Sequence, residues 1–134
     1  MRPMRKTLAL LFASLMLLLS ACAHAPGAKV DMIGDFGNAV RWSDWDAAWS
    51  YIDPATRRSI TLPGEEQDRL QNVKVTGYTV RSTEPQDDGT MVQVVEIHYV
   101  DQATQVERAV RSRQVWRTDD DGKHWWLTTG LPEF

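Results

Sequence analysis

The feature that most constrains the fold is a series of strand-like segments in the second half of the chain. From residue 73 onward Val, Thr, Tyr and Trp dominate, and these residue types fit the pleated, half-buried surface of a β-sheet. Links of a few residues join antiparallel neighbours, because a parallel connection needs about a dozen residues or more. The sequence therefore predicts a four-stranded antiparallel sheet whose strand order follows the chain. The segments are 73–82, 90–100, 105–118 and 123–129, and the links between them are TEPQDDG, DQAT and DDDG.

Two helical segments are expected before the strands. The first, over residues 31–42, repeats apolar residues at the three- and four-residue spacing of one helix face. The second is expected to begin at Ser43 as its N-cap and to end at Asp53, because Pro54 stops it. Helices followed by a meander predict the α+β class, with the helices packed on the inner face of a curved sheet. The apolar residues of the first segment are Ile33, Phe36 and Val40.

A stripe of aromatic residues runs along the second helical segment. Trp42, Trp45, Trp49 and Ile52 follow one another at intervals of three, four and three residues. Such a stripe can be a carbohydrate platform or a partner surface, but an indole buries roughly 150 to 250 Å² when it is inside a protein. Since the domain has few other large apolar residues, we expect the stripe to be core.

The first residues of the chain have the pattern of an export signal. Arg2, Arg5 and Lys6 precede 12 uncharged residues, 8–19. A helix that spans a membrane needs about 20 apolar residues, whereas the apolar region of a secretory signal takes about 7 to 15. The run is too short to span a membrane, so residues 1–21 are expected to be a signal peptide.

The sequence Leu-Ser-Ala-Cys at residues 19–22 resembles the lipobox of bacterial lipoproteins. The resemblance implies cleavage just before Cys22, diacylglycerol on its thiol and a further acyl chain, such as palmitate, on its new amino group. Two or more acyl chains give stable anchoring, whereas a single chain binds only marginally. Residues 22–31 would then be a flexible tether, and residues 32–134 a single domain.

The same resemblance implies a location. In lipoproteins of this kind an Asp after the cysteine retains the protein in the inner membrane, and this chain has Ala23 there. We therefore expect the outer membrane, with the domain on the periplasmic face. Exposure at the cell surface stays open as an alternative.

Charge and cysteine content narrow the range of partners. From Cys22 onward the chain has 113 residues and keeps all 18 acidic residues but only 12 of the 15 basic ones, which gives a formal charge of −6. An acidic chain without a basic cluster argues against nucleic acid and against docking on anionic lipid. Cys22 is the only cysteine, so the core must hold without a disulfide.

The order of the elements resembles that of the NTF2-like superfamily, whose cone-shaped domain occurs in several small proteobacterial lipoproteins. The sequences AVRWSDWDAAWSYIDP at residues 39–54 and WWLTTGLPEF at residues 125–134 contribute to the resemblance. The cystatin-like fold has nearly the same order and stays open as an alternative. The superfamily includes isomerases and dehydratases that place Asp, His or Tyr inside the cone.

Glu96 and His98 are the strongest candidates for such chemistry. If DQAT forms the turn, Val100 pairs with Gln105 and His98 with Glu107, which places both candidates on the solvated face of the sheet. We therefore predict no catalytic site. The three histidines of the chain are dispersed without metal-ligand spacing, and no cofactor motif occurs.

One aromatic residue is expected on the outside. By the same pairing Trp126 faces outward beside Val115 and near Arg113, and Trp with Arg is the composition favoured at binding hot spots. The alternative is that the last residues of the chain, GLPEF, cover this tryptophan.

These observations favour a non-catalytic binding or assembly module without a cofactor, whose partner is a periplasmic or outer-membrane protein. The alternative is a small-molecule-binding protein, or an enzyme of the lyase or isomerase type, that uses a pocket in the cone. In that case Tyr78, Tyr99 and Trp45 would lie on the walls of the pocket.

Overall fold

The computed structural model describes residues 28–60, 64–119 and 122–134. The expected signal peptide, Cys22 and the first part of the tether lie outside these residues. Within them the helices α2 (Ala28–Arg41), α3 (Trp45–Ser50), α4 (Pro54–Ser59) and α5 (Gly64–Asn72) come first. The strands β1 (Val73–Pro85), β2 (Met91–Asp101), β3 (Val106–Thr118) and β4 (Trp125–Leu127) follow. The first turn of α2 takes in residues 28–31, which were expected to belong to the tether.

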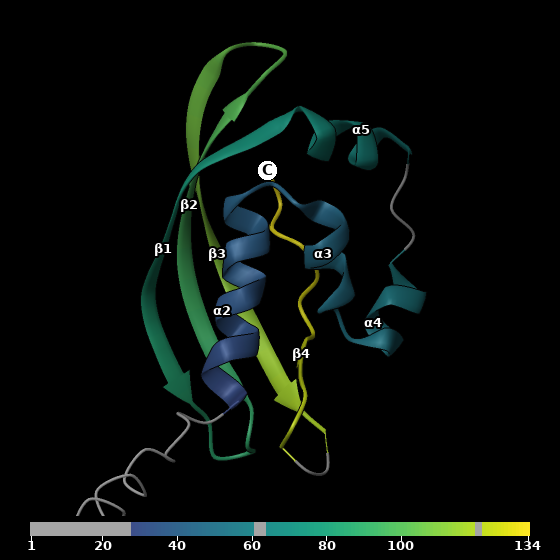
Figure 1. The fold of residues 1–134 in the computed structure, drawn as a ribbon, viewed down its shortest axis with the longest axis vertical. Helices are drawn as coiled ribbons and strands as arrows, with labels where there is room; N and C mark the ends of the chain where they lie inside the picture. Colours follow the sequence, from purple (N-terminus) through teal and green to yellow (C-terminus); the bar gives the residue numbers. More distant parts are fainter. Residues whose placement is uncertain (1–27, 61–63, 120–121) are drawn as a thin grey trace, which may run out of the picture.

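The four strands form one antiparallel sheet in the order β1-β2-β3-β4. Figure 1 shows α2 lying along one face of this sheet with α3 beside it, while the β2–β3 hairpin extends beyond the helices. The predicted α+β class and the antiparallel meander are confirmed. We call the side of the sheet that faces α2 the inner face and the opposite side the outer face.

The core lies between α2 and the inner face. The apolar residues of α2 predicted to share one helix face, Ile33, Phe36 and Val40, are all buried. The Phe36 ring meets the ring of Trp116 edge to face, with centroids 5.2 Å apart. Burying a side chain of this size contributes roughly 1.5 to 3 kcal/mol. The sheet supplies the other half of the core, including Val95, Ile97, Tyr99, Trp116, Trp125 and Leu127.

The register between β2 and β3 differs by two residues from the register predicted. Asp101 pairs with Val106, and His98 consequently pairs with Ala109 rather than with Glu107. The carboxylate of Asp101 accepts hydrogen bonds from the N–H groups of Ala103 and Thr104, which places the turn one residue later than expected. Because side chains alternate with a period of two, a shift of two residues leaves each side chain on its predicted face.

The boundaries of the second helical segment were predicted wrongly. Asp44, not Ser43, is the N-cap of α3. The helix ends at Ser50, and Ile52 then forms a parallel bridge with Leu127 at the edge of β4. Pro54 begins α4 rather than ending a helix, which suits proline because the first turn leaves its N–H positions unpaired in any case.

The prediction that the tryptophan stripe is core is wrong for Trp42. This side chain is 79% exposed, the most exposed of the large hydrophobic residues described. Trp45 and Trp49 are half-buried and pack against the core, and Ile52 is fully buried. The stripe therefore changes from exposed to buried along its length.

Candidate functional site

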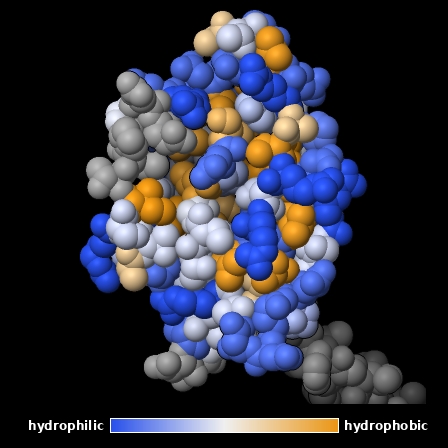
Figure 2. Space-filling view, turned by 180° about the vertical axis from the view of Figure 1, so that it is seen from behind, coloured by the Kyte–Doolittle hydropathy of each residue, from blue (hydrophilic) through white to orange (hydrophobic). Residues whose placement is uncertain are grey.

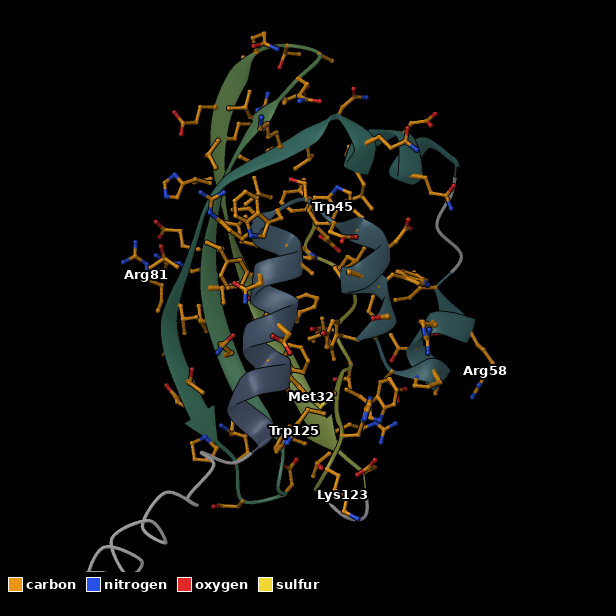
Figure 3. All side chains as sticks on the ribbon, viewed as in Figure 1. Met32, Trp45, Arg58, Arg81, Lys123 and Trp125 are labelled. Carbon is orange, nitrogen blue, oxygen red and sulfur yellow. The ribbon has the colours of Figure 1, made fainter. Side chains whose placement is uncertain are left out.

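A carboxylate surrounded by basic groups lies on the outer face of the sheet. Glu96 Oε1 accepts a hydrogen bond from Arg81 Nη2 at 2.8 Å and lies 3.1 Å from His98 Nε2, while Arg111 Nη2 is 3.6 Å from Glu96 Oε2. The hydrogen bond from Arg81, followed by that from His98, lowers the pKa of Glu96 to about 2. Figure 3 shows Arg81 pointing away from the helices.

This cluster does not have the properties of an acid–base pair. A general base needs a pKa near the working pH and a position within reach of a substrate. The pKa of Glu96 is far below neutral pH, and the side chains of Arg81 and His98 are about half exposed. The cluster is a cross-strand charge network of the kind that ordinary sheet surfaces carry.

Apolar side chains are interspersed among these charges. Val92, Val94 and Val115 are half-buried and share the outer face with Glu96, because they alternate with the buried residues of β2 and β3. The described helices lie in front of the sheet or beside it (Figure 1). Figure 2, the view from behind, shows hydrophobic patches interrupted by hydrophilic side chains. Within the part of the chain that the structure describes, the outer face thus carries partly exposed apolar side chains.

Trp126 lies at the β4 end of this face. It is half-buried between two buried neighbours on β4, and its ring lies against the ring of His124 with centroids 4.2 Å apart. Its cross-strand partner is Arg117. Arg113 is four residues earlier on β3, roughly 13 Å along the strand. The arginine directly opposite Trp126 is therefore Arg117, and Arg113, which was expected near Trp126, lies farther along β3.

Arg117 is held in place by a buried carboxylate. It forms an ion pair with Asp53, which is only 4% exposed. The same carboxylate accepts the N–H groups of Ala55 at 3.0 Å and Thr56 at 3.1 Å. Burial alone would raise the pKa of Asp53, but the hydrogen bonds from Arg117 and from the Thr56 N–H outweigh it, so the pKa falls below its usual value. Asp53 thus ties the start of α4 to β3, next to Trp126.

Aromatic side chains fill one end of the domain interior. Phe134 packs between Trp45 and Tyr99, with ring centroids 5.3 and 5.0 Å apart, and so closes one end of the core. Deeper inside, Gln114 Nε2 donates a hydrogen bond to the Tyr78 hydroxyl at 3.1 Å. Burial raises the pKa of Tyr78 to about 12. Tyr78 is therefore a neutral phenol at physiological pH.

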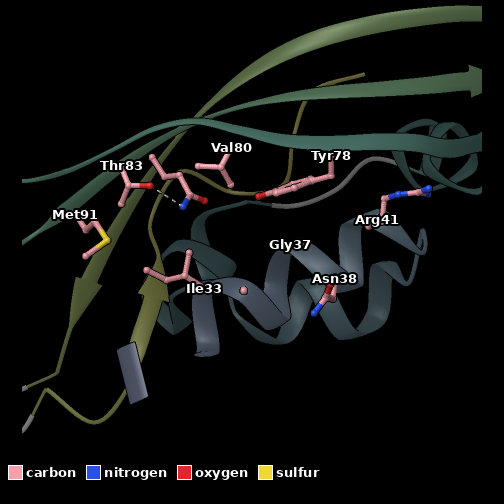
Figure 4. A pocket seen from close by; sticks show the side chains of 10 residues that line it. Ile33, Gly37, Asn38, Arg41, Tyr78, Val80, Thr83 and Met91 are labelled. Atoms are coloured by element: carbon pink, nitrogen blue, oxygen red, sulfur yellow. Dashed lines mark hydrogen bonds between the residues drawn. The ribbon is translucent and has the colours of Figure 1, made fainter. Parts of the chain in front are cut away.

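One groove opens between α2 and the sheet, with a volume of about 490 Å³. Its surface is mostly apolar, and on its sheet wall Gln93 Nε2 donates a hydrogen bond at 3.1 Å to Thr83 Oγ1, its cross-strand neighbour (Figure 4). The volume falls within the range of small-molecule sites, roughly 300 to 1,000 Å³. None of its ten described lining residues is Asp, Glu or His: Ile33, Gly34, Gly37, Asn38, Arg41, Tyr78, Val80, Thr83, Met91 and Gln93.

The three residues expected on the wall of one pocket lie in two places. Tyr78 lines the groove under α2, whereas Trp45 and Tyr99 both contact Phe134. Cys22 lies outside the described residues. No group of three or more His, Cys, Asp or Glu residues that could hold a metal ion occurs in the described ranges.

Sequence reasoning missed the features that fix these positions. Neither the contacts of Phe134 nor the ion pair between Asp53 and Arg117 was expected. No local sequence pattern indicates them, because both join residues far apart in the chain; Asp53 and Arg117 are 64 positions apart. A possible signal for Asp53 was its place directly before Pro54, because Asp before an N1 proline is a common helix start.

Comparisons with known proteins leave the family open. No family model, no curated protein and no solved structure matches the chain. Among the described helices none is long and apolar enough to cross a membrane.

Proposed function

We propose that this protein is a lipoprotein anchored in the outer membrane through Cys22, and that its domain is a non-catalytic binding or assembly module on the periplasmic face. The anchor rests on the lipobox resemblance of residues 19–22. The observation that carries the module is the contrast between the two faces of the sheet. Apart from the groove under α2, the inner face is packed with side chains, whereas the outer face leaves three valines and Trp126 partly accessible.

The outer face has the composition of a protein interface. Interface cores are enriched in Trp and Arg, and a few such residues carry most of the binding energy. Trp126 lies beside Arg117, and Arg113 has no ion pair among the described residues, so its guanidinium is available to a carboxylate of the partner. Val94 lies directly opposite Arg113 and would be covered by the same partner. We infer a periplasmic or outer-membrane protein as the partner.

We further propose that the domain is of the NTF2-like type, with the cystatin-like fold as the alternative. The order of helices and strands supports this proposal, as does the position of α2 on the inner face. The parallel bridge between Ile52 and Leu127 adds a short fifth segment to the edge of the sheet.

The groove under α2 supports a second candidate function, a small-molecule carrier or an enzyme of the lyase or isomerase type. Its volume is about 490 Å³, and Tyr78 and Gln93 give it a few polar groups, as ligand sites have. The Tyr78 hydroxyl, neutral because its pKa is about 12, donates to Gln114 Oε1 and keeps acceptor capacity for a ligand. Proton abstraction would need a base that the described lining residues do not supply.

Two single substitutions distinguish these functions in cells that lack the wild-type protein. Trp126→Ala should fold and reach the membrane but fail to restore function, because it removes the aromatic centre of the outer face. His98→Gln should restore function fully, because His98 only borders a surface carboxylate. Failure of His98→Gln together with success of Trp126→Ala would favour the catalytic alternative. Loss of function in Tyr78→Phe alone would favour the groove.

A further inference from the structure

Trp42 has no structural role that explains its identity. Tryptophan is the largest side chain and usually buries most of its area, yet Trp42 is 79% exposed at the end of α2. Arg41 lies beside it, with the guanidinium carbon 5.8 Å from the centre of the indole ring. This contact orients the ring but leaves most of it in solvent.

The turn that carries Trp42 is held rigidly. Asp44 N–H donates to Ala39 C=O and Ser43 N–H donates to Val40 C=O, both at 2.9 Å, which is the Schellman pattern at a helix end. Ser43 occupies the left-handed position, with φ of 57°, where glycine is the usual residue. A serine in this left-handed conformation is under backbone strain.

The Ser43 side chain provides a reason for that strain. Its hydroxyl accepts the N–H of Val75 at 3.0 Å, and Arg41 Nη1 donates to the C=O of the same residue at 3.1 Å. Both polar backbone groups of Val75 on the open side of β1 are thereby occupied. The turn is locked to the sheet, and Trp42 is presented in one orientation.

A hollow of about 480 Å³ lies next to this turn. Gln71, Lys74 and Gln102 are among the residues that line it, and within the described ranges no hydrogen bond or ion pair engages their side chains. Although the whole chain has a net charge of −3, the described residues that line the hollow include two cations and no carboxylate. Its lining residues are Arg41, Trp42, Ser43, Trp45, Gln71, Val73, Lys74, Val75 and Gln102.

We propose that this hollow is a binding site for an acidic saccharide, a sugar that carries a carboxylate. The apolar face of a pyranose ring packs on the indole of Trp42. The side-chain amides of Gln71 and Gln102 pair with its hydroxyl groups, since each amide can both donate and accept. Arg41 and Lys74 receive the carboxylate, and the guanidinium keeps donors beyond the one bonded to Val75. The site lies at the β1 edge of the sheet, opposite the β4 edge that carries Trp126, and does not depend on the partner surface proposed there.

An acidic peptide is the competing ligand, and the backbone argues against it. Peptides commonly bind an open sheet edge by adding a strand. At Val75 both backbone groups are already taken by Ser43 and Arg41, so strand addition is blocked beside the hollow. Recognition by side chains around the indole of Trp42 therefore favours a sugar ring over an acidic peptide.

Calorimetric titration of the full chain in detergent with trigalacturonate tests the proposal. A neutral galactose trimer and triglutamate serve as the comparison ligands. We expect binding of trigalacturonate only, weakened at least tenfold in Trp42→Ala and several-fold in Lys74→Gln, with an unchanged melting temperature in both. Arg58→Gln, an exposed cation on α4 (Figure 3), is the matched control and should bind as the wild type does.

Several results would overturn the proposal. Binding that is unaffected by Trp42→Ala would place the sugar elsewhere, and equal binding of the neutral trimer would remove the role of the two cations. Binding of triglutamate with none of trigalacturonate would make the hollow a peptide site. Should none of the three ligands bind at millimolar concentration, the hollow is not a saccharide site.

Discussion

Replacement of Asp53 by alanine should destabilise the domain more than replacement of any exposed carboxylate. The Asp53 side chain is 6% exposed and accepts hydrogen bonds from Arg117 and from the N–H groups of Ala55 and Thr56. It therefore caps α4 and joins that helix to the strand beside Trp126. Its removal leaves two helix donors and one guanidinium without their partner.

The magnitude follows from those contacts. Loss of an N-cap side chain costs about 0.5 to 2 kcal/mol, and loss of a hydrogen bond between charged groups costs about 1.5 to 3 kcal/mol. Because the Arg117 side chain is 43% exposed, water partly replaces the carboxylate. We therefore expect Asp53→Ala to lower the free energy of unfolding by about 3 kcal/mol, and Asp53→Asn by about 1 to 2 kcal/mol, since asparagine still caps the helix.

The effect should depend on pH in a defined direction. Although burial opposes it, the Arg117 and N–H hydrogen bonds lower the pKa of Asp53 below its usual value of 3.8. The ionised Asp53 carboxylate is therefore stabilised more in the folded state than in the unfolded state. The stability from this group is fully present above about pH 4 and is lost as the pH falls through the folded-state pKa.

Urea denaturation of the wild type and the two variants at pH 7 and pH 3 measures this effect. Asp87→Asn, which alters an exposed carboxylate in the β1–β2 turn, is the control and should stay within about 0.5 kcal/mol of the wild type. Equal stability of Asp53→Asn and the wild type at pH 7 would refute the reasoning. So would a difference between them that is no smaller at pH 3.

Three further predictions concern the anchor, the α2–α3 turn and the filled interior. Cys22→Ala should leave an uncleaved precursor that takes up no labelled palmitate, and palmitate incorporation without Cys22 would contradict the proposed anchor. Ala23→Asp should move the protein from the outer-membrane to the inner-membrane fraction of a density gradient. Ser43→Ala should lower the free energy of unfolding by about 1 to 3 kcal/mol, because the Val75 N–H loses its partner. Ser43→Gly should lower it less, because glycine relieves the positive φ. Equal losses of unfolding free energy in the two variants, measured by denaturation, would refute this. Phe134→Ala should lower the free energy of unfolding by about 2 to 3 kcal/mol, less than for a fully buried phenylalanine, and an unchanged melting temperature would show that Phe134 does not close the core.

The sheet could be predicted from the sequence because strands leave a local record. The alternation of Val95, Ile97 and Tyr99 with Glu96 and His98 identifies the buried face of β2 without knowledge of the partner strand. The exact register could not be read in the same way. It depends on the turn, where the Asp101 carboxylate binds backbone N–H groups, and the error of two residues left the faces unchanged.

The helix boundaries were harder to predict because a single residue, Ser43, ends α2 between Trp42 and Trp45. The spacing of Trp42, Trp45 and Trp49 describes one continuous helix face, but Ser43 has a left-handed conformation that ends α2 and begins a new direction for α3. Trp42 therefore belongs to the end of one helix and Trp45 to the start of the next. Nothing in the local sequence indicates the left-handed residue, since serine rarely occupies that position.

The outer face as a partner surface is the central claim, and site-specific photo-crosslinking in intact cells tests it most directly. A photoreactive phenylalanine derivative at position 126 or 94 lies on this face, and the same residue at position 58 lies on α4, away from it. We predict a discrete crosslinked species of the same mass from positions 126 and 94 and none from position 58. Crosslinks from position 58 with none from positions 126 and 94 would contradict the claim.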